Sequence, residues 1–305
     1  MNRIYMADGE LTASEISLGC YRNSCLSINE LDRLISAALE EGIDFFDHAD
    51  VYGGGQSEEK FGTVLKMKPG VREKIIIQTK CGIRQGYYDS SKEHILSAVD
   101  GSLKRLKTDR IDILLLHRPD ALIEPQEVGE AFLRLYASGK VKYFGVSNFN
   151  PMQIKLLSQH LKQKIILNQL QLSLTNTGMI DVGINVNLKN TRAADRDGSV
   201  LDYCRLNGIT LQAWSPFQYG FMEGVFLDND DYPELNSKIN EIAILKGVPK
   251  AAVAVAWILR HPAKIQVIVG TTNADRLKDI CRASEVTLSR QEWYALYQSA
   301  GNELP

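Results

Sequence analysis

The segment KIIIQT at residues 74–79 is apolar and rich in β-branched residues, and a lysine, Lys80, follows it at once. It does not alternate between apolar and polar side chains, which is typical of a strand buried on both faces of a parallel sheet. Segments of the same kind recur on either side of it. We expect strands at residues 15–19, 42–46, 74–79, 111–116, 142–147, 165–170, 209–214 and 266–270.

Helical patterns fill the intervals between these strands. Ser27 and Glu30 form a capping box ahead of an apolar helix face, and Pro151 follows Asn150, an expected N-cap. Eight strands alternating with helices predict a closed (β/α)8 TIM barrel, and the alternative is an open doubly wound sheet. The first residues, RIYMADGELTA, predict an N-terminal β-hairpin that turns at Asp8-Gly9 and covers the bottom of the barrel.

The length of 305 residues allows one large domain or two small ones. No low-complexity linker divides the chain, so we expect a single domain over residues 1–305. The interval 173–199 is long and poor in periodicity. Loops of this length are usually functional or mobile, so the barrel is expected to carry long loops on its C-terminal face.

The composition of the chain limits the classes of partner that it is expected to bind. The net charge of −2, without a basic cluster, argues against nucleic acid and anionic membranes. No apolar run reaches the roughly 20 residues that a membrane helix needs. Five scattered cysteines without CxxC spacing indicate reduced thiols and a cytoplasmic location. The oligomeric state cannot be read from these features.

Chemically useful side chains follow three consecutive expected strands. Asp47, Lys80 and His117 each come at a strand end, and Tyr52 lies on the loop after Asp47. Each alone would be an ordinary cap or surface group. A barrel gathers its chemistry at the C-terminal strand ends, so together they would share one side of the mouth. A phenol beside an ammonium, a carboxylate and an imidazole can hand a proton to a carbonyl oxygen.

A set of ordered motifs carries a family resemblance. The segments GIDFFDHADVYGGG, QTKCG, LLLHRPD, GKVKYFGVSNF, NQLQLS, AWSPF and VGTTNADRLKD resemble the aldo-keto reductase superfamily, and most of all the bacterial YdhF-type oxidoreductases. The resemblance implies an oxidoreductase that reduces aldehydes or ketones to alcohols with a hydride from NADPH. Tyr52 would be the general acid, Lys80 would lower its pKa, Asp47 would pair with Lys80, and His117 would orient the substrate carbonyl.

The same resemblance implies where the cofactor binds. No GxGxxG fingerprint follows the first strand, so a Rossmann pocket is not supported. The nicotinamide would meet a carboxamide-binding group and a stacking Trp214, and the phosphates would meet the segments after the last two strands. The implied cofactor contacts are Cys20, Tyr21, Asp47, Ser147, Asn148, Gln169, Trp214, Ser215, Pro216, Phe217, Gly270, Thr272, Arg276 and Asp279.

Arg276 decides the cofactor preference. Its planar donor fork suits a 2′-phosphate, which favours NADPH over NADH. The alternative is an exposed helix charge paired with Asp275 or Asp279. The chain departs from the common family pattern at Gly270, where many members carry a phosphate-binding lysine, and at His48, where threonine is common.

Two other functions remain open at this point. The first is a cofactor-binding regulatory or redox-sensing protein on the same fold, with little turnover; the presence of all four catalytic residue types argues against it. The second is a metal-dependent hydrolase with His48, Asp50 and His117 as ligands. No third histidine lies at a strand end, so we expect no metal. The small-molecule carbonyl substrate cannot be named from the sequence.

Overall fold

The computed structural model describes the whole chain, residues 1–305. Eight parallel strands form a closed barrel in the order β10-β3-β4-β5-β6-β7-β8-β9. Because β10 pairs with both β3 and β9, the barrel is closed, so the (β/α)8 prediction is confirmed and the open sheet is wrong. The barrel strands are β3 (Ile16–Gly19), β4 (Phe45–Asp47), β5 (Ile76–Cys81), β6 (Ile111–Leu116), β7 (Val141–Ser147), β8 (Ile165–Gln171), β9 (Thr210–Trp214) and β10 (Gln266–Val269).

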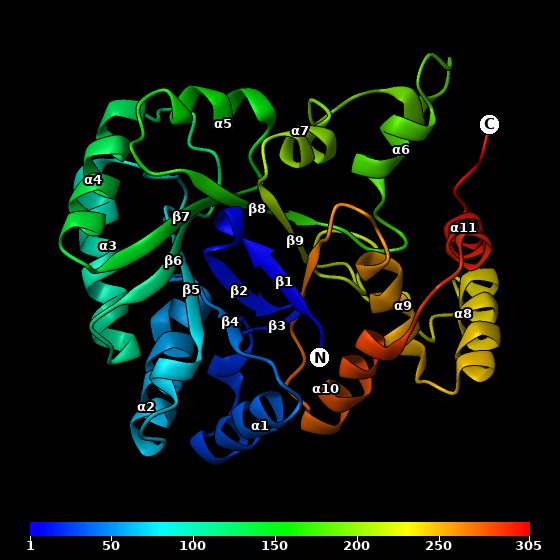
Figure 1. Cartoon of the computed structure of the whole chain (residues 1–305), viewed down its shortest axis with the longest axis horizontal. Helices are drawn as coiled ribbons and strands as arrows, with labels where there is room; N and C mark the ends of the chain where they lie inside the picture. The colour runs from blue at the N-terminus through cyan, green and yellow to red at the C-terminus, as the bar shows by residue number, and fades with distance from the viewer.

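Helices surround the barrel as an outer ring (Figure 1). They are α1 (Ile28–Glu40), α2 (Gln56–Met67), α3 (Lys92–Leu106), α4 (Pro125–Ala137), α5 (Pro151–Ser158), α6 (Gly178–Ile184), α7 (Val200–Leu206), α8 (Pro233–Lys246), α9 (Lys250–Leu259), α10 (Ala274–Cys281) and α11 (Arg290–Ser299). Short 3-10 turns are η1 (Ala7–Gly9), η2 (Asn23–Cys25), η3 (Tyr52–Gly55), η4 (Arg72–Lys74), η5 (Thr191–Ala193) and η6 (Arg282–Glu285). No single helix has the length and apolar character to cross a membrane; α8 and α9 reach them only together, as a pair bent by 93°.

The expected helix starts are present. The Ser27 side chain accepts from the Glu30 amide and Glu30 bonds back, so the capping box that begins α1 is confirmed. Asn150 caps α5 in the same reciprocal way, with Pro151 in the first turn. These caps satisfy amides that have no partner inside the helix, and they fix where each helix leaves the barrel.

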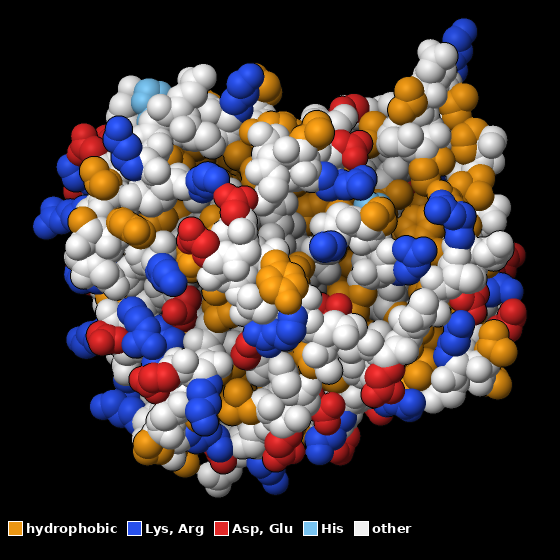
Figure 2. All heavy atoms as spheres, viewed as in Figure 1, with side chains coloured by type: hydrophobic (Ala, Val, Ile, Leu, Met, Phe, Trp, Pro, Cys, Tyr) orange, Lys and Arg blue, Asp and Glu red, His pale blue; other side chains and the backbone are white.

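An antiparallel hairpin closes the N-terminal end of the barrel. Strands β1 (Arg3–Met6) and β2 (Leu11–Ser14) are joined through Asp8 and Gly9, which have left-handed φ of 56° and 95°. Side chains from both strands pack on barrel residues that face inward; the cluster contains Ile4, Met6, Ala13, Phe45, Ile113, Leu115, Tyr143, Ile166 and Leu167. Figure 1 shows the hairpin across the barrel centre, and Figure 2 shows the same end with basic and acidic side chains interspersed. Only the opposite, C-terminal end is left open for chemistry.

Two expectations need correction. The second barrel strand was expected from residue 42 but begins at Phe45, because Gly42 has a left-handed φ of 82° that ends the preceding helix. The interval 173–199 was expected to be irregular, yet it contains α6. Long-range contacts hold this short helix: the Tyr297 hydroxyl donates to Asp181 at 2.6 Å, and Thr177 bonds Asn302 at 3.3 Å.

Candidate active site

Lys80 lies at the centre of the candidate site. It is the fifth residue of β5, and its side chain is 0% exposed. The ammonium donates to the Asp47 carboxylate at 2.8 Å, to the Tyr52 hydroxyl at 3.1 Å and to the His48 carbonyl at 2.8 Å. An ammonium has three donors. All three are therefore used, and the cation is held in one position against the phenol.

Asp47 completes a fully hydrogen-bonded buried ion pair. One carboxylate oxygen takes the Lys80 contact, and the other accepts from the Gln78 amide at 2.5 Å and the Gln169 amide at 3.1 Å. Removing two charges from water is costly unless such extra hydrogen bonds satisfy them. The neighbouring strands β4 and β5 thus meet β8, from across the barrel interior, at this carboxylate.

Tyr52 and His117 face each other across the mouth. Their rings are 5.8 Å apart and edge-on, and Tyr21 lies edge-on to Tyr52 at 5.0 Å. The Nε2 atom of His117 makes no hydrogen bond and is not sealed in the interior, whereas Nδ1 is buried without a partner. Burial, reinforced by Lys80 and Arg118, lowers the pKa of His117 well below its usual value. The imidazole is therefore neutral and can hydrogen-bond an uncharged oxygen.

The pKa of Tyr52 differs from the expectation. Lys80 was expected to lower it, and its charge does act in that direction. Burial has the larger effect, so the pKa of Tyr52 is raised above its usual value. Burial alone would lower the pKa of Lys80, but Asp47 and Tyr52 together raise it. The phenol is therefore protonated and the lysine charged at neutral pH, as a proton donor requires.

A glycine turn fixes Tyr52 in place. Gly53, Gly54 and Gly55 have left-handed φ of 58°, 63° and 94°. A Cβ on Gly53 would lie 2.4 Å from the Ser24 Cβ, so only glycine fits there. This close packing makes the turn a tight one.

The residues implied for the nicotinamide carboxamide also come together. Asn148 donates to the Ser147 hydroxyl at 2.8 Å and accepts from the Trp214 indole at 3.3 Å. Ser147 in turn donates to the Gln169 carbonyl at 3.0 Å. The four residues lie at the ends of β7, β8 and β9, with Asn148 directly after β7, and β7 pairs with β6, the strand that precedes His117. They form one continuous polar wall with Asp47, which Gln169 also contacts.

The other implied cofactor residues spread around the mouth. Cys20 is fully buried, so its side chain offers no exposed surface, while Tyr21 is 45% exposed. Ser215 has a left-handed φ of 52°, Pro216 is buried, and Phe217 is half-buried. Gly270 and Thr272 lie between β10 and α10; Arg276 and Asp279 are exposed on α10. Of these residues only Cys20 is bonded to a catalytic candidate, through its backbone N–H, which donates to the Asp47 carbonyl at 2.8 Å.

Arg276 is not paired with Asp275 or Asp279. Arg276 is an exposed charge on α10, as the alternative expected, but no ion pair involves its guanidinium, so the expected pairing with an aspartate is absent. Asn273 caps α10 and accepts from the Arg276 amide at 2.9 Å. Together with the Gln169 side-chain oxygen, which has no protein partner, this unpaired guanidinium suits a nicotinamide dinucleotide, whose phosphates are anionic.

Sequence reasoning missed two arginines at the mouth. Arg22 donates to the Gly270 carbonyl at 3.1 Å and so joins the ends of β3 and β10. Arg118 lies 5.9 Å from the Trp214 ring centre and 5.6 Å from that of Phe221, and it has no acidic partner. Each directly follows a residue that was singled out, Tyr21 or His117. That adjacency is the signal that could have found them.

No metal site accompanies these groups. Nowhere in the chain do three or more His, Cys, Asp or Glu side chains lie where they could hold a metal ion.

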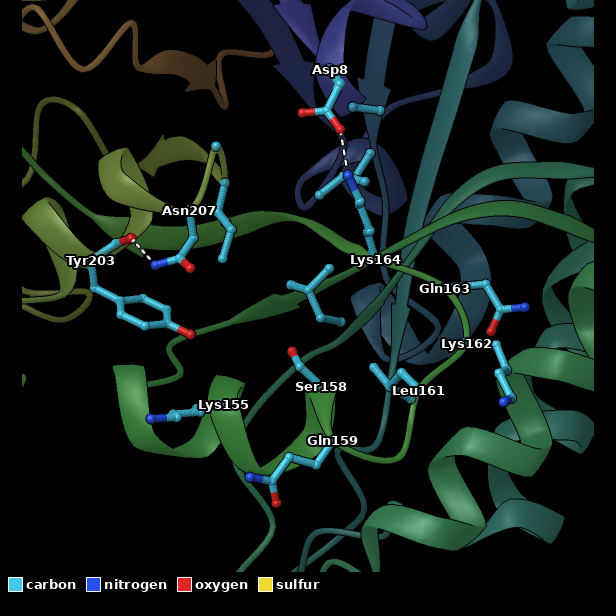
Figure 3. A pocket seen from close by; sticks show the side chains of 15 residues that line it. Asp8, Lys155, Ser158, Gln159, Leu161, Lys162, Gln163, Lys164, Tyr203 and Asn207 are labelled. Atoms are coloured by element: carbon cyan, nitrogen blue, oxygen red, sulfur yellow. Dashed lines mark hydrogen bonds and ion pairs between the residues drawn. The ribbon is translucent and has the colours of Figure 1, made fainter.

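A hollow of roughly 580 Å³ lies at the N-terminal end of the barrel, between the hairpin turn, α5 and α7. Figure 3 shows Asp8 and Lys164 bonded across it, at the end of the barrel opposite the catalytic candidates.

His48 gives the structure a testable acid sensitivity. It is fully buried against Phe61, both ring nitrogens lack partners, and burial lowers its pKa from 6.5 to about 3. Below pH 6.5 the unfolded chain binds a proton that the folded chain does not. Stability is therefore lost as the pH falls from 6.5 towards 3, by roughly 1 kcal/mol per pH unit from this residue.

We expect His48→Thr to reduce that pH dependence. Urea unfolding at pH 7.5, 6 and 5 should show a free energy of unfolding that falls less steeply with acid than in the unmodified chain. His160→Thr, at an exposed histidine, is the matched control and should keep the original slope. An unchanged slope in His48→Thr would contradict the assigned titration.

Comparisons with known proteins agree with the geometry. The sequence pattern of the Aldo/keto reductase family matches residues 15–300. The 6-dehydroglucose reductase of Agrobacterium fabrum is 37% identical, covering 98% of each chain. Oxidoreductase YdhF of Escherichia coli is 33% identical, covering 92% of this chain and 91% of its own length. The crystal structure of the thermostable aldo-keto reductase Tm1743 with the inhibitor epalrestat has a TM-score of 0.79 at 24% identity, covering 98% of this chain and 100% of that one.

Proposed function

The chain belongs to the aldo/keto reductase family, and from that premise we propose that it reduces an aldehyde or ketone to an alcohol with NADPH. One observation carries the proposal. The buried Lys80 ammonium contacts the Tyr52 hydroxyl and the Asp47 carboxylate at once, at 3.1 and 2.8 Å. This arrangement suits a phenol that gives up a proton and a neighbour that stabilises the charge left behind.

The residues divide the proton chemistry between them. Tyr52 donates its hydroxyl proton to the carbonyl oxygen, and Lys80 stabilises the resulting phenolate through the bond that already joins them. Asp47 keeps the Lys80 ammonium charged and holds it in position against the Tyr52 hydroxyl. His117, neutral and carrying its proton on Nε2, donates a hydrogen bond that orients the carbonyl. A bound reduced nicotinamide would supply the hydride.

Ser147, Asn148 and Gln169 would hold the nicotinamide, with Trp214 beside it. Asn148 and Ser147 are bonded to each other, so they offer a polar wall that already has its shape before binding. Arg22 and the start of α10 would meet the phosphates. A pre-formed wall of this kind lowers the ordering cost of binding a flexible dinucleotide.

The preference for NADPH rests on Arg276. Replacing Arg276 with leucine should raise the Kd for NADPH by about 10- to 100-fold, because charge-assisted hydrogen bonds contribute about 1.5–3 kcal/mol. The Kd for NADH should stay within about twofold, since NADH lacks the phosphate that the guanidinium would bind. Fluorescence titration of the purified chain with both dinucleotides measures this. Lys278→Leu, another exposed cation on α10, is the matched control; an equal loss for both cofactors would contradict the role of Arg276.

Turnover distinguishes the proposal from its alternative. A panel of aldehydes, ketones and quinones, assayed by loss of NADPH absorbance, should include at least one substrate. 6-Dehydroglucose is included because the Agrobacterium relative is named for it. Tight NADPH binding without turnover of any compound would favour a cofactor-binding regulatory or redox-sensing protein instead.

We further propose that the protein works in the cytoplasm as a single domain, residues 1–305, with a small molecule as its partner. The net charge of −2 supports this, because nucleic acid binds basic surfaces. The five cysteines that form no disulfide support it as well, because free thiols are typical of a reducing compartment. Recovery of the protein in a membrane pellet, or a shift of labelled nucleic acid in a gel, would contradict it.

A further inference from the structure

Four buried glutamines form a chain of hydrogen bonds through the barrel interior. Gln266, at the start of β10, donates to the Ser14 carbonyl of the hairpin at 2.7 Å. Its side-chain oxygen accepts from Gln212 at 2.7 Å. The Gln212 oxygen accepts from Gln78 and from Gln169, at 3.0 Å each. We call Gln266, Gln212, Gln78 and Gln169 the glutamine relay; all four are at most 3% exposed.

The relay ends at the catalytic carboxylate. The same Gln78 and Gln169 amide nitrogens that bond Gln212 also donate to one oxygen of Asp47, at 2.5 and 3.1 Å. An amide nitrogen carries two N–H donors. Each of the two amides therefore uses both donors inside the barrel, one on Asp47 and one on Gln212.

Both ends of the relay fix its direction. A side-chain amide can be turned over, and its orientation is settled by the bonds around it. Here the lower end is a peptide carbonyl and the upper end a carboxylate, and both can only accept. Every amide between them must then point its N–H groups as observed. Turning any one over would place two acceptor oxygens together in a buried site.

This direction decides what Gln169 presents at the mouth. Both N–H groups of the Gln169 side chain are bonded within the protein. The side-chain oxygen of Gln169 has no protein partner and is not fully buried. The corresponding oxygen of Gln78 is also unpartnered but is buried. Gln169 therefore offers a hydrogen-bond acceptor, and no donor, to whatever binds beside it.

We propose that Gln212 and Gln266 are positioning residues that, together with Asp47, hold the Gln169 carbonyl towards the cofactor, so that the site selects a pyridine carboxamide over a pyridine carboxylate. The inference rests on the proposed function, since it takes a nicotinamide dinucleotide as the ligand. A carboxamide N–H can bond the Gln169 oxygen. A carboxylate in the same place sets acceptor against acceptor. With Gln212 present, turning the Gln169 amide over would place its oxygen against both the Gln212 oxygen and the Asp47 carboxylate. Without Gln212, only the Asp47 contact opposes the turn, so Gln169 can offer a donor at a lower cost.

The test compares two ligands that differ only at that group, NADP+ and nicotinic acid adenine dinucleotide phosphate. Their Kd values for the purified full chain are measured by calorimetry, without turnover. The unmodified protein should prefer NADP+ by at least about tenfold, the scale of one unsatisfied buried hydrogen-bonding group. Gln212→Leu should reduce this preference by about threefold or more, because one of the two contacts that oppose turning the Gln169 amide is lost, and Gln266→Leu should reduce it by a smaller factor.

Gln78→Leu is the matched control. It removes a buried glutamine and one of the two amide donors to Asp47, but it leaves both partners of the Gln169 nitrogen in place. Its preference for NADP+ should equal that of the unmodified protein. If Gln212→Leu does not fold, Gln266→Leu still tests the same restraint on the Gln169 amide, because Gln266 holds Gln212 in its orientation.

The outcomes separate the two proposals. An unmodified protein that binds neither dinucleotide overturns the proposed function. A protein that binds NADP+ and keeps an undiminished preference in Gln212→Leu and Gln266→Leu overturns the relay while leaving the function standing. Loss of preference in Gln78→Leu as large as in Gln212→Leu also overturns it, because general damage to the barrel interior would then explain both.

Discussion

Replacing Tyr52 with phenylalanine should lower kcat/KM for every carbonyl substrate by about 10²- to 10⁴-fold, the contribution of a positioned general acid. The change deletes one oxygen, the atom 3.1 Å from the Lys80 ammonium. The ring and its edge contacts with Tyr21 and His117 can remain. The Kd for NADPH should therefore stay within about twofold, and the loss should fall on kcat.

Tyr21→Phe is the matched control for this prediction. Tyr21 lies beside Tyr52 at the mouth but is 45% exposed and makes no contact with Lys80. Steady-state kinetics and a fluorescence titration of NADPH on both variants make the comparison. Turnover retained in Tyr52→Phe, or an equal loss in Tyr21→Phe, would remove Tyr52 from the proton-donating role.

Replacing Lys80 with methionine should have the largest effect on stability. It leaves the Asp47 charge buried at 3% side-chain exposure without its cation. Breaking a buried pair in this way costs about 3–5 kcal/mol. Turnover should fall as well, because the phenolate left on Tyr52 loses the ammonium that stabilises it. Urea unfolding at pH 7.5 and steady-state kinetics measure the two losses.

A double variant separates the two effects. Lys80→Met with Asp47→Asn removes both charges, so it should recover much of the lost stability while turnover stays low. Lys140→Met is the surface control: its pair with Asp100 is largely exposed, and its loss should cost at most about 1 kcal/mol. If Lys80→Met is no less stable than Lys140→Met, the buried pair does not stabilise the fold as described.

The barrel was readable from the sequence because its strands are buried on both faces. β6 is the strand expected at residues 111–116, and β7 and β8 differ from expectation by one residue at one end. Strand ends beside glycine were harder, as β4 shows, because the left-handed Gly42 interrupts an otherwise apolar run. The helix α6 was missed since its stability comes from Tyr297 and Asn302, more than a hundred residues away.

The candidate site was readable for a different reason. In a parallel barrel, consecutive strands are neighbours, so side chains at the ends of β4, β5 and β6 must meet. The sequence therefore brought Asp47, Lys80 and His117 to one side of the mouth. It identified Lys80 as a group that lowers the Tyr52 pKa, but it did not include the larger opposing effect of burial, because the extent of burial depends on how the loops pack. Arg118 was overlooked, since its aromatic neighbours come from the far side of the barrel.

The sequence by itself determined which residues lie at the open end of the barrel and in what order. The apolar pattern of each strand and the capping residues of each helix are local features, so they can be recognised from neighbouring residues. Only the tertiary structure decided which atoms touch. The bond from Gln78 to Gln212 joins residues 134 positions apart, and nothing local to either one specifies it. Closure of the barrel sets the distance, and the acceptor-only groups at Ser14 and Asp47 then set the direction of every amide between them.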